Sequence, residues 1–436
     1  MDELVRDDVL SRRLQIPKSV ILVLLLLTIG GIATFIAQIS GPKPDAAWQI
    51  YLVNFLFWTG VAQGGIIFSC AIRITNARWG RPLIRISEGF GSFIPVSFIL
   101  LIILFVGRDH ILPYATEHYH PPKEFWLNIP FVISRNLGGF FILIILSFFY
   151  VYYSLRMDLG GVRDKLHGIS SWIASGWKGD DERDKIWPKI KKLAPAVVLV
   201  YAVVFSLFAW DLMMSLDPEW YSTLFGPFYF VGNFVAAIGG TIIISSFVRK
   251  YTGLQAYITR SQYHDIGKML LGLSLFWVYL FFSQFLPIWY GNMPEEAGFV
   301  YTRARVEPFA TFGWVVLSCC FIFPFITLFS KTNKIVIPIL VFIASVSFIG
   351  FWLVEYILVI PSFTNYINFG FIQVLITLGF LSGFVLTFLW FVSSFPIIPY
   401  GDPYFTGKGD SSKVAHKGSL FEDLMRKDNA KNSGGH

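Results

Sequence analysis

Ten stretches of about twenty or more mainly apolar residues recur along this 436-residue chain, and they constrain its fold more than any other feature. A helix needs that length to cross about 30 Å of hydrocarbon at about 1.5 Å per residue. Only 14% of the residues are charged, against about 25% in a typical soluble domain. We therefore predict an all-α polytopic membrane protein with ten transmembrane helices, near residues 18–39, 48–73, 89–108, 128–155, 194–215, 223–248, 268–290, 308–330, 335–358 and 366–395.

The basic residues alternate between the two sides of this arrangement. Of the 35 Lys and Arg residues, 29 fall in the termini and in the loops after even-numbered spans, five fall on the other side, and Arg135 lies inside the fourth span. Basic loops stay in the cytoplasm, so we expect a cytoplasmic N-terminus (1–17) and a cytoplasmic C-terminal tail (396–436). Orientation accounts for the net charge of +7, and we expect no nucleic-acid partner.

The fifth and sixth spans meet at a short acidic turn, Asp217–Trp220, and a carboxylate, Asp211, lies near the end of the fifth span. A charge inside hydrocarbon is costly, and such charges are retained where they have a partner or a function. Several spans carry polar residues in the outer half, the half nearest this turn. The full candidate set is Asp211, Glu355, Arg135, Asn233, Gln284 and Gln373 inside the spans, Asp109 and His110 at the rim of the third span, and Glu88 at its cytoplasmic start.

Two interpretations of these polar residues remain open. In the first, the outer residues converge and form a proton relay or a quinone-adjacent surface, and Glu88 serves the cytoplasmic side. In the second, Asp211 and Glu355 pair with Arg135 purely as structural support, and Glu88 pairs with Arg85. Polar groups inside a membrane are stable only when they face one another or water, which both interpretations satisfy.

The sequence offers no ligand set for a redox cofactor. No histidine falls in the middle of a span, although b-type haem in a membrane bundle needs inward-facing axial ligands, usually histidine. Cys70, Cys319 and Cys320 fall in apolar runs and match neither a haem-attachment motif nor an iron–sulfur ligand pattern. We therefore expect that this chain binds no metal, haem or cluster itself.

The stretch around the acidic turn, Met214–Gly226, resembles the NrfD-like integral membrane subunits of respiratory complexes. Gly107–Pro113 at the end of the third span and Asn54–Arg73 in the second are also similar to that family. Among its members the chain looks most like the ActF-type subunit of alternative complex III, a bacterial quinol:cytochrome c oxidoreductase. The resemblance implies two four-helix bundles flanked by two further helices, in a bacterial inner membrane.

The same resemblance implies that the redox cofactors belong to partner chains. The implied partners are an iron–sulfur protein with iron–sulfur clusters, multihaem and monohaem cytochromes c with haem c, a sister NrfD-like membrane subunit, a terminal oxidase and lipids, with menaquinol or ubiquinol as a ligand. Where the sister subunit has His-Ser-Thr, this chain has Tyr221, Ser222 and Thr223. That difference favours proton conduction or scaffolding over quinol binding by this chain.

Taken together, these features predict a membrane subunit of a quinol-oxidising electron-transfer complex of the alternative complex III type. It would contribute a proton route or a quinone-adjacent surface and anchor the redox partners. Three alternatives remain open: the quinone subunit of a polysulfide-reductase-type complex, a purely structural anchor, and a secondary transporter. The spans lack the paired Gly/Pro interruptions that would indicate a transporter substrate site. Whether the chain itself takes part in enzyme chemistry is left open.

Overall fold

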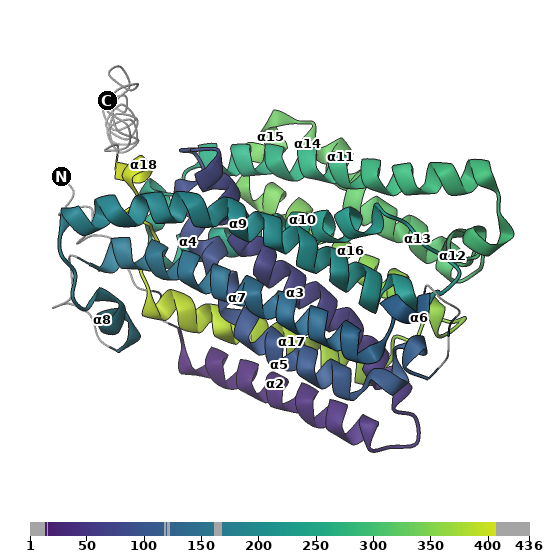
Figure 1. The fold of residues 1–436 in the computed structure, drawn as a ribbon. Coiled ribbons are helices and arrows are strands. Elements are labelled where there is room, and N and C mark those ends of the chain that lie inside the picture. Colours follow the sequence, from purple (N-terminus) through teal and green to yellow (C-terminus); the bar gives the residue numbers. More distant parts are fainter. Residues whose placement is uncertain (1–13, 15, 117–118, 120–122, 161–167, 407–436) are drawn as a thin grey trace.

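The computed structural model describes residues 14, 16–116, 119, 123–160 and 168–406. Every regular element within these ranges is a helix. Ten of the helical segments are long and apolar enough to cross a membrane, and they run side by side along one axis (Figure 1). Each overlaps one of the ten predicted spans, so the predicted all-α polytopic fold is confirmed for the described part of the chain.

The ten spanning segments run back and forth along the bundle. In chain order they are α2 (Lys18–Ile39), α3 (Asp45–Ile74), α4 and α5 (Arg81–Phe90 and Ile94–Val106), α7 (Ile129–Leu159), α9 (Asp180–Leu212), α10 (Phe225–Thr252), α11 (Arg260–Gly291), α13 and α14 (Phe309–Leu317 and Phe323–Leu328), α16 (Ile337–Val359) and α17 (Phe371–Ser394). A 3-10 turn, Gly91–Phe93, joins α4 to α5, and a π-helical turn, Ser318–Ile322, joins α13 to α14. Consecutive connections therefore fall at alternate ends of the bundle.

Short helices mark the two ends. One end carries the α3–α4 turn, α8 (Ile169–Ala174), α15 (Lys331–Ile335) and α18 (Pro403–Thr406). We call it the basic end, because its loops hold most of the Lys and Arg residues. The opposite end carries α6 (Lys123–Trp126), α12 (Pro294–Ala304) and the acidic turn between α9 and α10.

Contacts between the long helices form two closed rings of four. The first ring contains α3, α4–α5, α7 and α9, and the second contains α10, α11, α13–α14 and α16. The rings meet where α3 packs against α10 and α16, while α2 and α17 pack on each other beside α3. This is the predicted arrangement of two four-helix bundles with two flanking helices.

Small residues allow the central helices to approach closely. A Cβ atom at Gly60 of α3 would lie 2.0 Å from the Asn233 Oδ1 of α10, and one at Gly64 would lie 2.7 Å from the Ala237 Cβ. Such positions promote helix packing in lipid, where apolar burial alone gives no preference for a neighbouring helix. In its most apolar 18-residue window α3 is 94% buried, against 6% for α2. α3 is therefore a core helix, and α2 faces lipid.

The structure differs from two predicted boundaries. The third spanning segment begins at Arg81 instead of near residue 89, and the fifth begins at Asp180 instead of near residue 194. Hydropathy misses both starts because they are polar: α4 reads RPLIRISEGF and α9 opens with DDERDKIWPKIKK. All residues of α4 are nonetheless buried. The predicted C-terminal tail from residue 407 onward lies outside the described residues.

Candidate functional site

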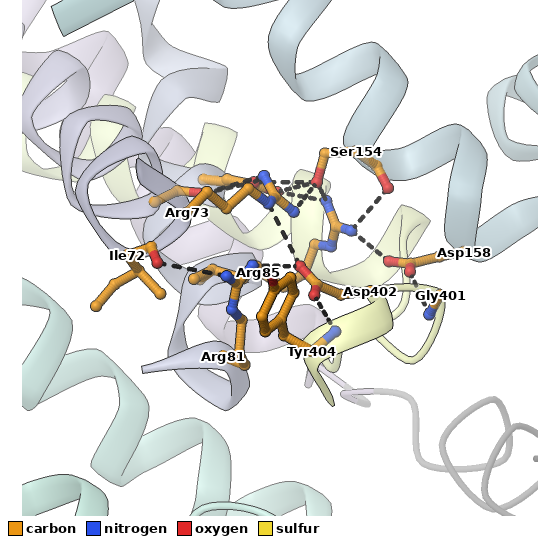
Figure 2. A network of polar contacts seen from close by, with 12 residues as sticks. Ile72, Arg73, Arg81, Arg85, Ser154, Asp158, Gly401, Asp402 and Tyr404 are labelled. Atoms are coloured by element: carbon orange, nitrogen blue, oxygen red, sulfur yellow. Dashed lines mark hydrogen bonds and ion pairs between the residues drawn. The ribbon is translucent and has the colours of Figure 1, made fainter. Parts of the chain in front are cut away.

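Six charged side chains meet inside the protein near the basic end (Figure 2). They are Arg73 in α3, Arg81, Arg85 and Glu88 in α4, Asp158 in α7 and Asp402 just before α18. Each of these residues is at most 1% exposed. We call them the inner charge network. Three cations face three carboxylates, so the ionised network carries no net charge.

Glu88 accepts hydrogen bonds from three helices. Its Oε1 accepts from Arg73 at 2.7 Å and from Ser69 at 2.7 Å, both in α3. Ser154 of α7 donates to the same oxygen at 3.0 Å, and Arg85 pairs with the Oε2. Glu88 therefore does pair with Arg85, and Arg73 is a second cationic partner that the sequence did not indicate.

The rest of the network fastens the segment after α17 to the helices. Arg81 pairs with Asp402, with 2.7 Å between the guanidinium nitrogen and the carboxylate oxygen. Asp158 pairs with Arg85, and its Oδ1 also accepts the backbone N–H of Gly401 at 2.8 Å. The network thus joins α3, α4, α7 and the C-terminal segment, as Figure 2 shows.

Three arginines counted as loop cations in the orientation argument are in fact interior residues. Arg73, Arg81 and Arg85 bind carboxylates instead of water, because removing a charge from water is tolerable only with a partner. The sequence did carry one signal: residues 81, 85 and 88 share one face of a helix. Nothing in the sequence pointed to Asp158 or Asp402.

Asp211, in the last turn of α9, is held by two residues of α7. Arg135 donates to it from Nε at 2.8 Å and from Nη2 at 2.5 Å, and Asn136 donates at 2.6 Å. Asp211 is fully buried, and the Arg135 Cζ lies 4.0 Å from the ring centre of Trp126. Because both carboxylate oxygens are bonded, Asp211 fits the structural interpretation. Asn136 was not among the predicted residues.

Glu355 of α16 has a different environment. It is 4% exposed, and within the described residues it makes neither an ion pair nor a hydrogen bond; its Oε2 is fully buried without a partner. The amide nitrogen of Asn233, on the facing helix α10, is also buried without a partner. Tyr229, one turn before Asn233, interacts with both side chains. We call Glu355, Asn233 and Tyr229 the Glu355 site.

The other predicted residues lie elsewhere. Gln284 of α11 accepts a hydrogen bond at 2.9 Å from a serine hydroxyl of the α9–α10 turn. Gln373 caps the start of α17 through a backbone N–H at 3.0 Å. Asp109 and His110 lie in a 3-10 turn at the opposite end, with side chains 59% and 42% exposed. The outer residues therefore do not converge, because they belong to separate helix contacts.

A buried arginine that the sequence did not single out connects the acidic turn to the Glu355 helix. Arg303 of α12 donates to the carbonyl oxygens of Ile357 at 3.0 Å and Leu358 at 2.9 Å, near the end of α16. Burial lowers the pKa of Arg303 to about 9, and nearby Asp217 opposes that shift. Burial also raises the pKa of Asp217. The acidic turn and α12 thus cover the end of the helix that carries Glu355.

The described residues place no group of three or more His, Cys, Asp or Glu side chains where they would hold a metal ion together. Cys70 and Cys320 are buried and Cys319 is half-buried, and all three are free thiols. The site chemistry visible in this chain is therefore that of carboxylates, their cations and buried amide and hydroxyl groups.

A comparison with known proteins finds a relative in Halobacterium salinarum, whose name describes it as a "Putative dimethyl sulfoxide reductase membrane subunit". It is 25% identical to this chain over 278 residues, covering 61% of this chain and 59% of the relative. The chain thus spans about three fifths of the length of the curated relative it matches. No family model matches the chain. The similarity and the ten candidate spans support a multi-pass membrane protein that resembles a membrane subunit of a reductase.

We predict that Asp211→Asn lowers stability more than activity. The substitution leaves Arg135 inside the protein without its counter-charge, and breaking a buried ion pair costs about 3 kcal/mol or more. Thermal and denaturant unfolding of the purified protein would measure the loss. Asp109→Asn, the same change at an exposed acid, is the control, and we expect an effect within about 0.5 kcal/mol. An Asp211→Asn protein of normal stability but impaired turnover would instead support the relay interpretation.

Proposed function

We propose that this chain is the membrane subunit of a reductase-type redox complex. The observation that carries the proposal is its similarity over 278 residues to the Halobacterium protein, whose name describes a reductase membrane subunit. Ten candidate spans in two packed bundles fit such a role. On this proposal the redox cofactors reside on partner chains, with an iron–sulfur protein as the nearest electron-transfer partner, in a cytoplasmic membrane with both termini in the cytoplasm.

The similarity favours a polysulfide- or dimethyl sulfoxide-reductase-type complex over alternative complex III. The alternative complex III assignment rests on the likeness of Met214–Gly226 and two other short stretches, and it remains the second candidate. The two types differ in their partners: only the second includes cytochromes with haem c. In both, the membrane subunit meets the quinone pool, and menaquinol or ubiquinol is the expected electron carrier.

Within such a complex we assign proton exchange to Glu355 in preference to Asp211. Oxidation of a quinol releases two protons with its two electrons, and reduction of a quinone takes them up, so a buried group that accepts and donates protons is needed. A carboxyl buried without a cation is stable as the neutral acid and can give up its proton to an arriving base or water. Glu355 meets this condition, whereas Asp211 and Glu88 are held by arginines.

Purification of the tagged chain from its native membrane tests the proposed complex. We expect co-purifying subunits that carry iron–sulfur clusters, and no haem absorbance from this chain when it is isolated alone. Haem c on the co-purifying subunits would move the assignment to alternative complex III. A chain that purifies without redox partners, under conditions where its fold is intact, would contradict both assignments and favour a transporter.

We predict that Glu355→Gln leaves assembly intact and impairs proton-coupled turnover. The amide keeps the shape of the side chain, and no ion pair is lost, so stability should change by no more than about 1 kcal/mol. Quinol-linked turnover should fall about tenfold or more, since a group that transfers protons is removed. Glu219→Gln, in the exposed part of the acidic turn, is the matched control. Normal turnover in the Glu355→Gln complex would leave only a scaffold role for this chain.

A further inference from the structure

A stripe of three lysines follows one face of α9 at the basic end. Lys185, Lys189 and Lys192 are exposed, and their spacings of four and three place them on the same face of the helix. In the part of the chain that the structure describes, none of the three forms a salt bridge. Glu182, one turn before the stripe, is already bound by Arg156 of α7 at 2.6 Å. The stripe therefore presents three uncompensated positive charges.

The same face of α9 continues as an apolar surface. Leu199 and Val203, the next exposed residues along it, are 69% and 57% exposed. α9 contains 33 residues, so it is about 50 Å long, while the hydrocarbon layer is about 30 Å thick. Its first turns therefore extend into the headgroup region. A face with lysines at headgroup depth and apolar side chains below them matches the two chemical parts of a phospholipid.

α7 forms a second wall beside this face. The Lys189 nitrogen lies 5.2 Å from the ring centre of Tyr153, and Tyr153 stacks on Phe149 with ring centres 6.4 Å apart. Phe149 is 44% exposed, and α7 and α9 pack against each other. Aromatic residues favour the membrane interface, and lysines there attract anionic headgroups. The corner between the two helices thus has the same order of chemistry as the stripe: cation first, apolar surface below.

We propose that the lysine stripe of α9 and the Tyr153 edge of α7 bind an anionic phospholipid, with its phosphate at the lysines and an acyl chain along Leu199. This site is separate from the Glu355 site and does not depend on the proposed redox function. Lys191 provides a comparison within the same helix. It points to another face, where its nitrogen lies 5.5 Å from the Trp187 ring and 5.7 Å from the Tyr404 ring.

Native mass spectrometry of the full-length protein in detergent tests this site, with phosphatidylglycerol as the probe and phosphatidylcholine in parallel. The double variant Lys189→Gln/Lys192→Gln should retain phosphatidylglycerol about tenfold less well or worse, since each interfacial lysine contributes about 1 kcal/mol to anionic lipid binding. Lys191→Gln/Lys331→Gln removes the same charge elsewhere at the basic end and should stay within about twofold of the unmodified protein. Lys189→Arg/Lys192→Arg should keep the lipid.

Three results would overturn the proposal. Equal losses in the two glutamine variants would show that general surface charge, not this stripe, attracts the lipid. Displacement of phosphatidylglycerol by millimolar inorganic phosphate would show an anion site without lipid specificity. No preference for phosphatidylglycerol over phosphatidylcholine in the unmodified protein would leave the stripe to an acidic partner protein.

Discussion

Charge in a hydrocarbon layer needs a counter-charge or hydrogen-bond partners, and this requirement shapes the interior of the first helix bundle. Near the basic end, three arginines and three carboxylates neutralise one another across α3, α4, α7 and the segment after α17. Near the opposite end, Arg135 of α7 neutralises Asp211 of α9. These contacts connect helices that are distant in sequence. The first bundle is therefore tied by ion pairs at both ends, in addition to its apolar packing.

The Glu355 site departs from this rule. A carboxylate whose oxygens are saturated by arginine and amide donors is a fixed anion, because losing its charge would leave a buried cation behind. A carboxyl group that exchanges protons needs an oxygen free of such donors. Glu355 has one, and the acidic turn and Arg303 cover the end of its helix. The contrast between the two kinds of carboxyl group is the physical basis for assigning a structural role to Asp211 and a chemical role to Glu355.

Hydropathy was sufficient to predict the ten spans, since the length of an apolar run is set by the thickness of the membrane. It was insufficient where polar residues are buried against each other. The start of α4 reads as a basic loop, yet its arginines meet Asp158 and Asp402, which lie far away in the sequence. Asp211 and Glu355 look alike in the sequence, as acids near the ends of apolar runs. Only the neighbours that the fold brings to each of them distinguish the fixed anion from the unpaired acid.

Infrared spectroscopy of the carboxyl groups tests this distinction most directly. At neutral pH the account predicts a carbonyl stretch of a buried, protonated carboxylic acid, which disappears in Glu355→Gln and persists in Asp211→Asn. The reverse pattern, with the band lost in Asp211→Asn and retained in Glu355→Gln, would contradict the account, as would a protein that shows no protonated carboxyl band at all.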